Sequence, residues 1–297
     1  MECVGIGVDW GSSNARAWAF GTGGSVLGRN ALEIGLNEAR ETGFDAAFDG
    51  LVAPLRDHTN APTSVPIVAC GMIGAQAGWF EVPYLDVPTK LESWLSDPAQ
   101  TPRSGVSIIN GAAQRTHQAD VMRGEETQIC GAALLGHEGL ICLPGTHSKW
   151  AVVEHGKLVR FNTFVTGELY AITRRHAIFG QLTADGDFDP EAFEQGLDAA
   201  REIPLLSLLF QARSRVLAGG LSDTQANWFL SGALVGAEIL TANPDQQPVT
   251  LVADDTLEKI YRHALDYLGF STTHLSVEAC TTTALFHALQ HQNRSKS

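Results

Sequence analysis

Several features that mark specialised classes of protein are scarce in this sequence of 297 residues. Its five cysteines are odd in number and show no paired CxxC spacing, so a disulfide framework or a zinc site is not expected. No window reaches about 18 apolar residues, and the N-terminus lacks a basic region followed by a long apolar run. These absences predict a cytoplasmic protein that does not enter a membrane.

Positive charge is also scarce, because 20 Lys and Arg stand against 33 Asp and Glu and the formal net charge is -13. The overall field repels phosphates, which disfavours nonspecific binding to nucleic acid or to an anionic membrane. A nucleotide ligand is still allowed, since it needs only local backbone donors and a metal ion. Hydrophobic residues are plentiful at 44%, and the length suits two domains of roughly 150 residues each.

One order of strands and turns occurs twice in the sequence. The expected strands are 4–8, 15–20 and 25–33 in the first opening, and 140–143, 150–154 and 158–164 in the second. The first opening is followed by a helical pattern at 43–57 and a buried strand at 65–70. Two three-stranded openings, each led by a turn of small residues, suggest an internal duplication.

The second half of the sequence is the more helical. Helices are expected at 167–175, twice within 189–213, and at 223–240, 255–268 and 278–291, with a strand at 249–253. Strands that alternate with helices predict an α/β fold with largely buried sheets. We place the two lobes at 1–135 and 136–297, and we expect the tail from Gln290 to be disordered.

The turn after the first strand could bind phosphate. It leads into another strand rather than a helix, so it is neither a Walker loop nor a dinucleotide fingerprint. Backbone N–H groups and hydroxyls can still be presented to phosphate oxygens by Gly11, Ser12, Ser13 and Asn14. Asp9, at the end of a buried strand, is placed to hold a hydrated Mg²⁺. The other interpretation is an ordinary hairpin turn, where these residue types are common.

The turn that leads the second opening has the same character. A second phosphate could be held by Gly145, Thr146, His147 and Ser148, with Lys149 as a nearby cation. A lone histidine is more often structural than catalytic. Two phosphate-type turns at equivalent places of two repeats are similar to the actin, hexokinase and chaperone superfamily, in which the nucleotide lies in the cleft between two lobes.

Several motifs together resemble the 2-dehydro-3-deoxygalactonokinase family, in order from Val8 to Glu238. They are VDWGSSNARAW (8–18), GMIGAQAGWFEVPYLDVP (71–88), DVMRGEETQICGA (120–132), PGTHSKW (144–150), FNTFVTGELYA (161–171) and FLSGALVGAE (229–238). The resemblance implies a duplicated, two-lobed actin-like (ribonuclease H-like) fold with ATP in the interlobe cleft. It also implies Mg²⁺-dependent phosphorylation of 2-dehydro-3-deoxy-D-galactonate at its 6-hydroxyl, in galactonate catabolism.

The stretch at 123–128 opens a helix where related carbohydrate kinases carry a Gly-Asp pair, whose Asp is the catalytic base. A kinase needs a carboxylate to accept the proton of the attacking hydroxyl, and Glu125 or Glu126 could serve. Glu125 follows Gly124 directly, as the Asp does in those relatives. The other interpretation is that acidic residues in a first turn stabilise the helix dipole.

The sugar acid has candidates in the loop from Gly71 to Trp79 and at the helix start near Thr166. A helix N-terminus could receive the substrate carboxylate, and an arginine could bind it through two parallel hydrogen bonds. The predicted substrate residues are Arg16, Gly71, Met72, Trp79, Arg123, Lys149, Thr166 and Glu168. Each cation could instead sit in a structural ion pair, and a buried tryptophan is usually part of a core.

The adenosine candidates are small residues, namely Ser231, Gly232, Gly236 and Ala253. They would let the adenine pack against backbone, although close helix packing explains such residues equally well. The sequence departs from the family where Ala253 stands in place of a usual Gly, and in the loop 74–78, where a more polar run is expected. The nucleotide contacts and the exact sugar acid therefore stay open.

Three other functions stay open as well. The first is a kinase of the same fold for another acid or an amino sugar, the second a nucleotide-binding switch or assembly protein, and the third a kinase-like sensor without catalysis. A homodimer is neither predicted nor excluded. His287 and His291 are spaced four apart on the last helix, but no third ligand is apparent in the sequence, so we expect surface residues rather than a metal site.

Overall fold

A computed structural model describes residues 2–116 and 118–294 and divides into two compact units. Unit 1 takes the described residues of Met1–Glu138, Ala151–Phe161 and Leu275–Ser297, and unit 2 consists of Gly139–Trp150 and Asn162–His274. Neither unit is contiguous in the chain. The predicted lobes 1–135 and 136–297 therefore stay a prediction, and each unit is described here by itself.

Unit 1 is built on a six-stranded sheet with the order β3-β2-β1-β4-β8-β7. Its strands are β1 (Cys3–Trp10), β2 (Ala15–Gly21), β3 (Val26–Leu32), β4 (Ile67–Gly71), β7 (Ala99–Gln100) and β8 (Val106–Ile108). The first three are antiparallel neighbours, whereas β4 runs parallel to β1 and β8 runs parallel to β4. The carboxyl ends of β1 and β4 therefore lie at the same edge of the sheet.

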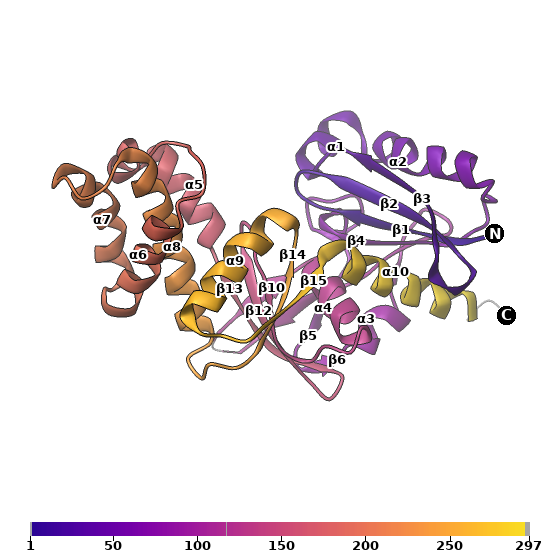
Figure 1. Ribbon diagram of the computed structural model, residues 1–297. Helices are drawn as coiled ribbons and strands as arrows, with labels where there is room; N and C mark the ends of the chain where they lie inside the picture. Colours follow the sequence, from indigo (N-terminus) through magenta and orange to yellow (C-terminus); the bar gives the residue numbers. More distant parts are fainter. Residues whose placement is uncertain (1, 117, 295–297) are drawn as a thin grey trace. The chain divides into compact units, whose positions relative to one another are not determined.

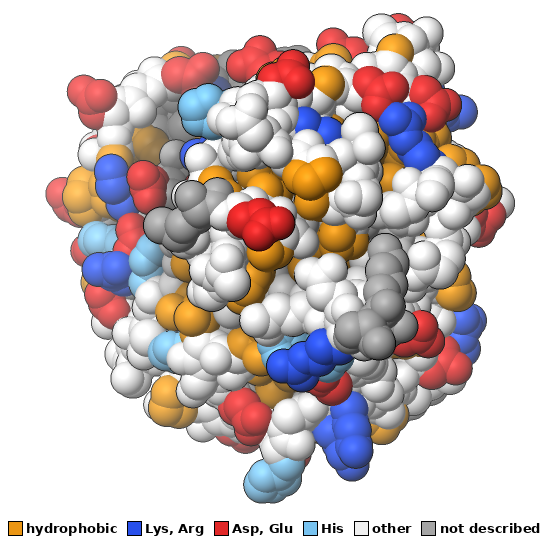
Figure 2. Space-filling model, turned by 90° about the vertical axis from the view of Figure 1, so that its right-hand side faces the viewer, with side chains coloured by type: hydrophobic (Ala, Val, Ile, Leu, Met, Phe, Trp, Pro, Cys, Tyr) orange, Lys and Arg blue, Asp and Glu red, His pale blue; other side chains and the backbone are white. Residues whose placement is uncertain are grey.

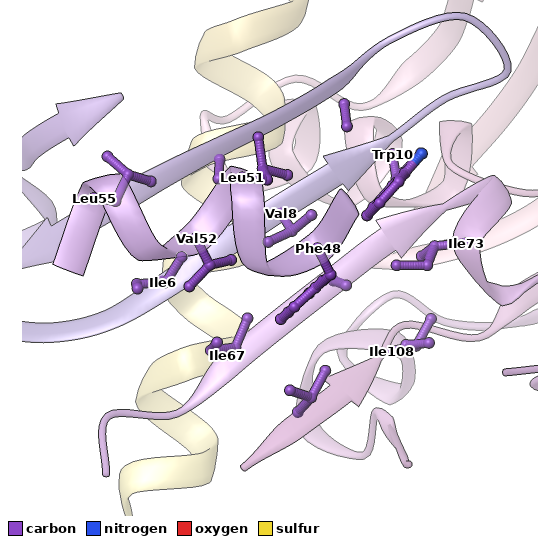
Figure 3. Packing of buried hydrophobic residues seen from close by; sticks show 14 of the residues in the cluster. Ile6, Val8, Trp10, Phe48, Leu51, Val52, Leu55, Ile67, Ile73 and Ile108 are labelled. Carbon is purple, nitrogen blue, oxygen red and sulfur yellow. The ribbon is translucent and has the colours of Figure 1, made fainter. Parts of the chain in front are cut away.

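One face of this sheet is covered by helices α1 (Leu36–Thr42) and α2 (Phe44–Thr59), which lie over the strands in Figure 1. The buried positions of α2 follow helical spacing and are Ala47, Phe48, Leu51, Val52 and Leu55. They pack against alternate residues of β1, namely Ile6, Val8 and Trp10, as Figure 3 shows. Each large apolar side chain buried here contributes roughly 1.5–3 kcal/mol of hydrophobic stabilisation.

The opposite face of β1 carries glycine, because side chains alternate between the faces of a strand. A Cβ at Gly5 would lie 2.7 Å from Leu289, and a Cβ at Gly7 would lie 2.9 Å from Leu285. These leucines belong to α10 (Val277–Arg294), which also packs against α4 (Glu125–Leu134). The two glycines therefore let α10 approach the backbone of the central strand closely.

Unit 1 contains a second, three-stranded sheet with the order β10-β9-β5. Its strands are β5 (Tyr84–Asp86), β9 (Gly111–Gln114) and β10 (Asp120–Met122). Short turns η1 (Thr22–Gly24) and η2 (Met72–Gly74), strand β6 (Thr89–Lys90) and helix α3 (Glu92–Ser96) complete the elements of this part of the chain. These short strands and α3 have no clear periodicity in the sequence and were not predicted.

A third sheet repeats the strand order of the first. Its order is β15-β14-β11-β12-β13-β6, with β11 (Gly139–Leu143), β12 (Ser148–Glu154), β13 (Lys157–Phe164), β14 (Val249–Ala253) and β15 (Thr272–Ser276). Read from the other side, β13-β12-β11-β14-β15 corresponds to β3-β2-β1-β4-β8, and β14 is parallel to β11 as β4 is to β1. This correspondence confirms the predicted duplication of one α/β architecture.

Unit 2 holds most of the helices of the second half. They are α5 (Thr166–His176), η3 (Ile178–Leu182), α6 (Pro190–Glu202), α7 (Leu205–Leu217), α8 (Asp223–Ala242) and α9 (Asp255–Leu268). In Figure 1, α6 and α8 lie side by side, and a Cβ added at Gly232 would lie only 2.0 Å from the carbonyl oxygen of Phe193. Gly232 therefore allows the close packing of these two helices.

One expectation about the last helix is wrong. The tail was predicted to be disordered from Gln290, but α10 continues to Arg294, where the side chains of Gln292 and Asn293 donate to Ser107 and to the carbonyl oxygen of Val4; residues 295–297 lie outside the described residues. His287 and His291 were expected to be surface residues, and both are partly exposed, with the carboxylate of Glu92 beside both rings. Glu92 is almost 200 residues from the two histidines in the sequence, so no local pattern indicates this contact.

The surface is mixed in charge on the face that Figure 2 shows, where basic side chains are scattered among acidic, polar and apolar ones. Among the described residues, no helix is both long and apolar enough to cross a membrane.

Candidate active site

Asp9 lies near the end of β1, at the edge where the parallel strands finish. Its neighbours in register are Arg16 on β2 and Cys70 on β4. Burial raises the pKa of the Asp9 carboxyl, and the negative charge of Glu125 raises it further, while Arg16 and a long hydrogen bond from Cys70 Sγ (3.7 Å) lower it. A carboxylate in such surroundings would gain from a cation.

Two glycines bring the start of α4 to this strand edge. Gly71 ends β4 with a φ of 90°, and a Cβ there would lie 2.6 Å from the carbonyl oxygen of Trp10. Gly124, just before α4, has a φ of 108°, and its Cβ would lie 3.3 Å from the Cα of Gly71. Both positions need a residue without a side chain, and their approach places the acidic first turn of α4 near Asp9.

The two glutamates of that first turn differ sharply. Glu126 is completely buried, and its carboxylate oxygens accept the backbone N–H of Gly124 at 2.9 and 2.7 Å and the hydroxyl of Thr127 at 3.3 Å. Burial, and then the charge of Glu125, raise the pKa of Glu126 to about 8. Glu125 stays partly exposed at the first position of the helix. Only Glu125 can therefore meet a molecule from solvent.

Arg123 is buried beneath the loop 71–79. Its Nη2 donates to the carbonyl oxygen of Val82 at 2.8 Å, and its guanidinium lies 4.3 Å from the ring centre of Tyr84. Its Nε and Nη1 have no hydrogen-bond partner among the described residues. A Cβ on Gly74 would lie 3.0 Å from Nη1, so the loop closes over the guanidinium. Unpaired donors of a buried cation are costly unless a ligand satisfies them.

Trp79, from the same loop, lies among hydrophobic residues instead. Its ring centre is 4.7 Å from that of Phe48 and 4.6 Å from that of Phe80, and the Arg103 guanidinium lies 5.4 Å away. The ring packs against the core under α2. This packing accounts for Trp79 without a ligand, and its substrate role stays a prediction, as does that of Met72.

The first predicted phosphate turn is tight and open to solvent. The N–H of Gly11 donates to the carbonyl oxygen of Asn14 at 2.8 Å, and Ser12, Ser13 and Asn14 are exposed. The carbonyl oxygen of Ser12 accepts the N–H of Leu36 at 3.2 Å, which anchors the turn to the start of α1. The hydroxyls and N–H groups here can meet a ligand.

The second predicted turn is anchored to the start of α5. The N–H of Glu168 donates to the carbonyl oxygen of Thr146 at 3.0 Å, and its carboxylate lies 2.8 Å from His147 Nε2. Gly167 makes this approach possible, because a Cβ there would lie 2.6 Å from the carbonyl oxygen of Gly145. The structure thus brings the predicted residues of this turn and of the α5 N-terminus together.

The ammonium group of Lys149 is held inside the second turn. Its side chain is buried, and its ammonium donates to the carbonyl oxygen of His147 at 2.9 Å. The cation therefore stabilises the backbone of the turn, and a role in substrate binding stays a prediction.

A buried polar network supports this second turn, and no local sequence pattern predicts it. Ser148 Oγ lies 3.1 Å from the Tyr261 hydroxyl, which donates to Glu238 Oε2 at 2.9 Å, and Trp150 Nε1 donates to Glu238 Oε1 at 2.8 Å. Burial raises the pKa of Glu238, while the hydrogen bonds from Thr166, Trp150, Tyr261 and Ser148 lower it. Such a network fixes Ser148 in one position.

Unit 2 also has a cavity of about 480 Å³ beside Thr166 and Glu238, lined mainly by apolar side chains of α5, α7 and α8. The predicted adenosine residues Ser231, Gly232 and Gly236 do not line it. Gly232 and Gly236 lie against α6 instead, with the Cβ of Gly236 expected 3.2 Å from Leu197 Cα. Their contact with adenosine stays a prediction, because helix packing already explains them.

The end of β14 has its own structural explanation. The carbonyl oxygen of Ala253 lies 3.1 Å from His274 Nε2, and the Asp254 carboxylate accepts the backbone N–H groups of Thr256 and Leu257 at the start of α9. Asp254 thus caps that helix.

Comparison with known proteins gives consistent matches along the chain. Residues 9–288 match the 2-keto-3-deoxy-galactonokinase family. The sequence is 36% identical over 293 residues to a probable 2-dehydro-3-deoxygalactonokinase of Rhizobium meliloti (strain 1021), covering 94% of each chain. It is 32% identical over 273 residues to the 2-dehydro-3-deoxygalactonokinase of Escherichia coli (strain K12), covering 90% of this chain and 91% of the relative.

A solved structure agrees. The crystal structure of a candidate 2-dehydro-3-deoxygalactonokinase from Sinorhizobium meliloti superposes with a TM-score of 0.90 at 35% identity, covering 96% of this chain and 98% of that one.

Proposed function

Because the chain belongs to the 2-keto-3-deoxy-galactonokinase family, we propose that it transfers the γ-phosphoryl group of ATP to the 6-hydroxyl of 2-dehydro-3-deoxy-D-galactonate. The bond from the substrate oxygen to the γ-phosphorus forms, the bond from that phosphorus to the β,γ-bridging oxygen breaks, and ADP leaves. The observation that carries this proposal is the approach of the acidic first turn of α4 to Asp9 through Gly71 and Gly124.

The base in this reaction is Glu125. The substrate hydroxyl must lose a proton as its oxygen attacks, and a carboxylate that reaches solvent can accept it. Glu126 is unsuited to this role, because it is fully buried and both its oxygens already accept the N–H of Gly124. Its role is to hold the start of α4, and so to position Glu125.

Asp9 fits a magnesium ion. Mg²⁺ prefers carboxylate and water oxygens, and it would neutralise charge on the transferred phosphoryl group. Burial raises the pKa of the Asp9 carboxyl, although the charge of Arg16 and a long hydrogen bond from Cys70 lower it. These partners compensate its ionised form only in part, and a cation would complete the compensation.

The two turns divide the binding of phosphates. We assign one phosphate group to the N–H groups and hydroxyls of 11–14 and another to those of 145–148. Backbone N–H groups grouped in a turn bind anions without needing a positive side chain. The chain's net charge of -13 makes such local donors necessary.

The carboxylate of the sugar acid has a candidate partner in Arg123. Its Nε and Nη1 are the unsatisfied donors of a buried guanidinium, and an arginine can bind a carboxylate through two parallel hydrogen bonds. The loop 71–79 covers these atoms, so substrate binding there requires that loop to move. Arg16 lies beside Asp9 in register, and its guanidinium is assigned to the phosphates rather than to the sugar acid.

The first test is ADP release from the purified protein with Mg²⁺ and ATP, across a panel of sugar acids. The panel contains 2-dehydro-3-deoxy-D-galactonate, 2-dehydro-3-deoxy-D-gluconate, an amino sugar and a neutral hexose. Turnover that is highest with the first compound supports the proposal. Preference for another acid would retain the mechanism and change the substrate. No turnover with any compound, by protein that binds ATP, would contradict the proposal and favour a sensor.

A further inference from the structure

Three side chains that take no part in the proposed reaction meet in unit 1. His287 and His291 lie one turn apart on the same face of α10, and Glu92 is the first residue of α3. The two imidazole rings have centres 4.9 Å apart, and the carboxylate of Glu92 lies beside both rings. All three are at least partly exposed, so an ion from solvent can reach them.

The ligand atoms have a spacing that suits a metal. The two Nε2 atoms are 3.2 Å apart, His287 Nε2 lies 3.4 Å from Glu92 Oε2, and His291 Nε2 lies 2.7 Å from Glu92 Oε1. Ligands held about 2.0–2.1 Å from a tetrahedral ion lie roughly 3.3–3.4 Å from one another. The distance between the two nitrogens and the distance from His287 to Glu92 are close to this value, and His291 would have to move roughly 0.6–0.7 Å away from Glu92. The two distances to Glu92 end on different oxygens, so the carboxylate would also turn to offer one oxygen to the ion.

Protons alone satisfy this cluster poorly. In neutral histidine Nε2 is either a donor or an acceptor, never both. If both Nε2 atoms carry hydrogen, each can donate to a different oxygen of Glu92, but the two donor nitrogens then lie only 3.2 Å apart. If only one carries hydrogen, the lone pair of the other faces the carboxylate. A cation removes the conflict, because all three lone pairs can then point at one centre.

We propose that Glu92, His287 and His291 bind a divalent transition-metal ion, with Zn²⁺ as the best-fitting member of the class. Two imidazole nitrogens and one carboxylate oxygen suit Zn²⁺ and are a poor set for Mg²⁺ or Ca²⁺, which prefer oxygen ligands. The fourth position of a tetrahedral ion stays open to water.

The ion joins α3 to α10. Helix α10 packs against β1 and α4, the elements that carry Asp9 and Glu125, and Cys130 Sγ of α4 donates to the carbonyl oxygen of Leu91 just before α3. Binding of an ion to the folded chain alone raises its stability by linkage. The site therefore strengthens unit 1, and it does not depend on the proposed function.

The test uses tag-free protein treated with EDTA, so that no affinity tag binds the ion. Zinc chloride is added in isothermal titration calorimetry and in thermal unfolding. Wild type is expected to bind one Zn²⁺ per chain and to unfold at a higher temperature with the ion. H291A and E92Q are each expected to weaken Zn²⁺ binding by about tenfold or more and to lose the shift.

H58A is the matched control, because His58 is an exposed histidine of the same unit, on α2. It should bind Zn²⁺ like wild type. E92Q keeps the shape of the side chain, so it guards against a variant that fails to fold. The proposal is overturned if wild type shows no saturable 1:1 binding, or if H291A and E92Q bind Zn²⁺ as tightly as H58A does.

Discussion

The two phosphate turns occupy equivalent places in the duplicated architecture but are built differently. The turn 11–14 follows β1, is exposed, and is held mainly by backbone hydrogen bonds. The turn 145–148 follows β11 and rests on a buried network through Tyr261 and Glu238. Beside the first turn, the Asp9 carboxyl accepts a long hydrogen bond of 3.7 Å from Cys70. The ionisable groups at the second turn are engaged in shorter hydrogen bonds, as His147 with Glu168 and Glu238 with Tyr261.

This difference suggests that the two copies acquired different roles after the duplication. Groups that must change charge or hold a metal need partial exposure and an unfilled coordination shell, and unit 1 supplies them. A turn that only holds a phosphate benefits from fixed geometry, which unit 2 supplies. Substitutions in unit 1 should therefore act mainly on kcat, and substitutions in unit 2 mainly on the KM for ATP and on stability.

Outside the first turn of α4, the largest effect is expected for D9N. Loss of the charge that would hold Mg²⁺ should lower kcat by about 10²- to 10³-fold, while the fold is kept. Because burial raises the pKa of this carboxyl, a neutral side chain should leave the unfolding temperature unchanged or higher. ADP release and thermal unfolding measure the two effects. An activity within tenfold of wild type would mean that Asp9 holds no essential ion.

The next effect is a pH dependence of stability from Glu126. Its pKa is about 8 in the folded chain against an ordinary 4.5, so the folded state holds the proton more tightly than the unfolded state. Its contribution is therefore greatest below about pH 4.5 and is lost as the pH rises toward 8, by about 1.4 kcal/mol per pH unit. Urea unfolding from pH 5 to 8 should show this slope in wild type. E126Q should lack it, and an equal slope in both proteins would contradict the assignment.

Removal of one hydroxyl from the network in unit 2 should cost less. Y261F leaves Ser148 and Glu238 without their shared partner, which should lower stability by about 1–3 kcal/mol and raise the KM for ATP. Y267F is the control, because Tyr267 lies on the same helix and its exposed hydroxyl donates to Asp198. Denaturant titration should find Y267F within about 0.5 kcal/mol of wild type. Equal losses in the two variants would remove the network from the account.

The smallest effect is expected for G145A, which adds one methyl group to the second turn. A Cβ at Gly145 would have nothing within 4 Å, so G145A should unfold within about 0.5 kcal/mol of wild type. If a phosphate approaches this backbone, the KM for ATP should still rise about tenfold. G71A is the contrast, since its φ of 90° and its approach to Trp10 make the substitution destabilising in itself. An unchanged KM in G145A would argue against a phosphate at this turn.

Local patterns were enough to predict most of the fold. The strands and turns of both openings and the helices from 189 to 268 follow from periodicity and turn chemistry, which depend on neighbouring residues. The end of α10 was harder, because residues 290–294 are only partly buried or exposed and have no apolar pattern of their own. They are held by the side chains of Gln292 and Asn293, which donate to Ser107 and to the carbonyl oxygen of Val4. The short strands β5 to β10 gave too little signal.

Site residues were predicted from the sequence only where they are close to one another in the chain. The turns and the pair at 125–126 were found as motifs, but which glutamate is buried depends on the positions of Gly71 and Gly124. Tyr261 and Glu238 are far from Ser148 in the sequence, and Glu92 is far from His291. Such neighbours are set by packing, and a single sequence carries no local sign of them.

The most direct test of the account compares E125Q with E126Q in ADP release from Mg·ATP and 2-dehydro-3-deoxy-D-galactonate. Both variants replace a carboxyl group by an amide of the same shape, at adjacent positions, so the comparison isolates the role of the exposed carboxylate. E125Q should lose about 10²- to 10⁴-fold in kcat, and E126Q should stay within about tenfold of wild type. The reverse order, or equal loss in both, would contradict Glu125 as the base and with it the division between the two units.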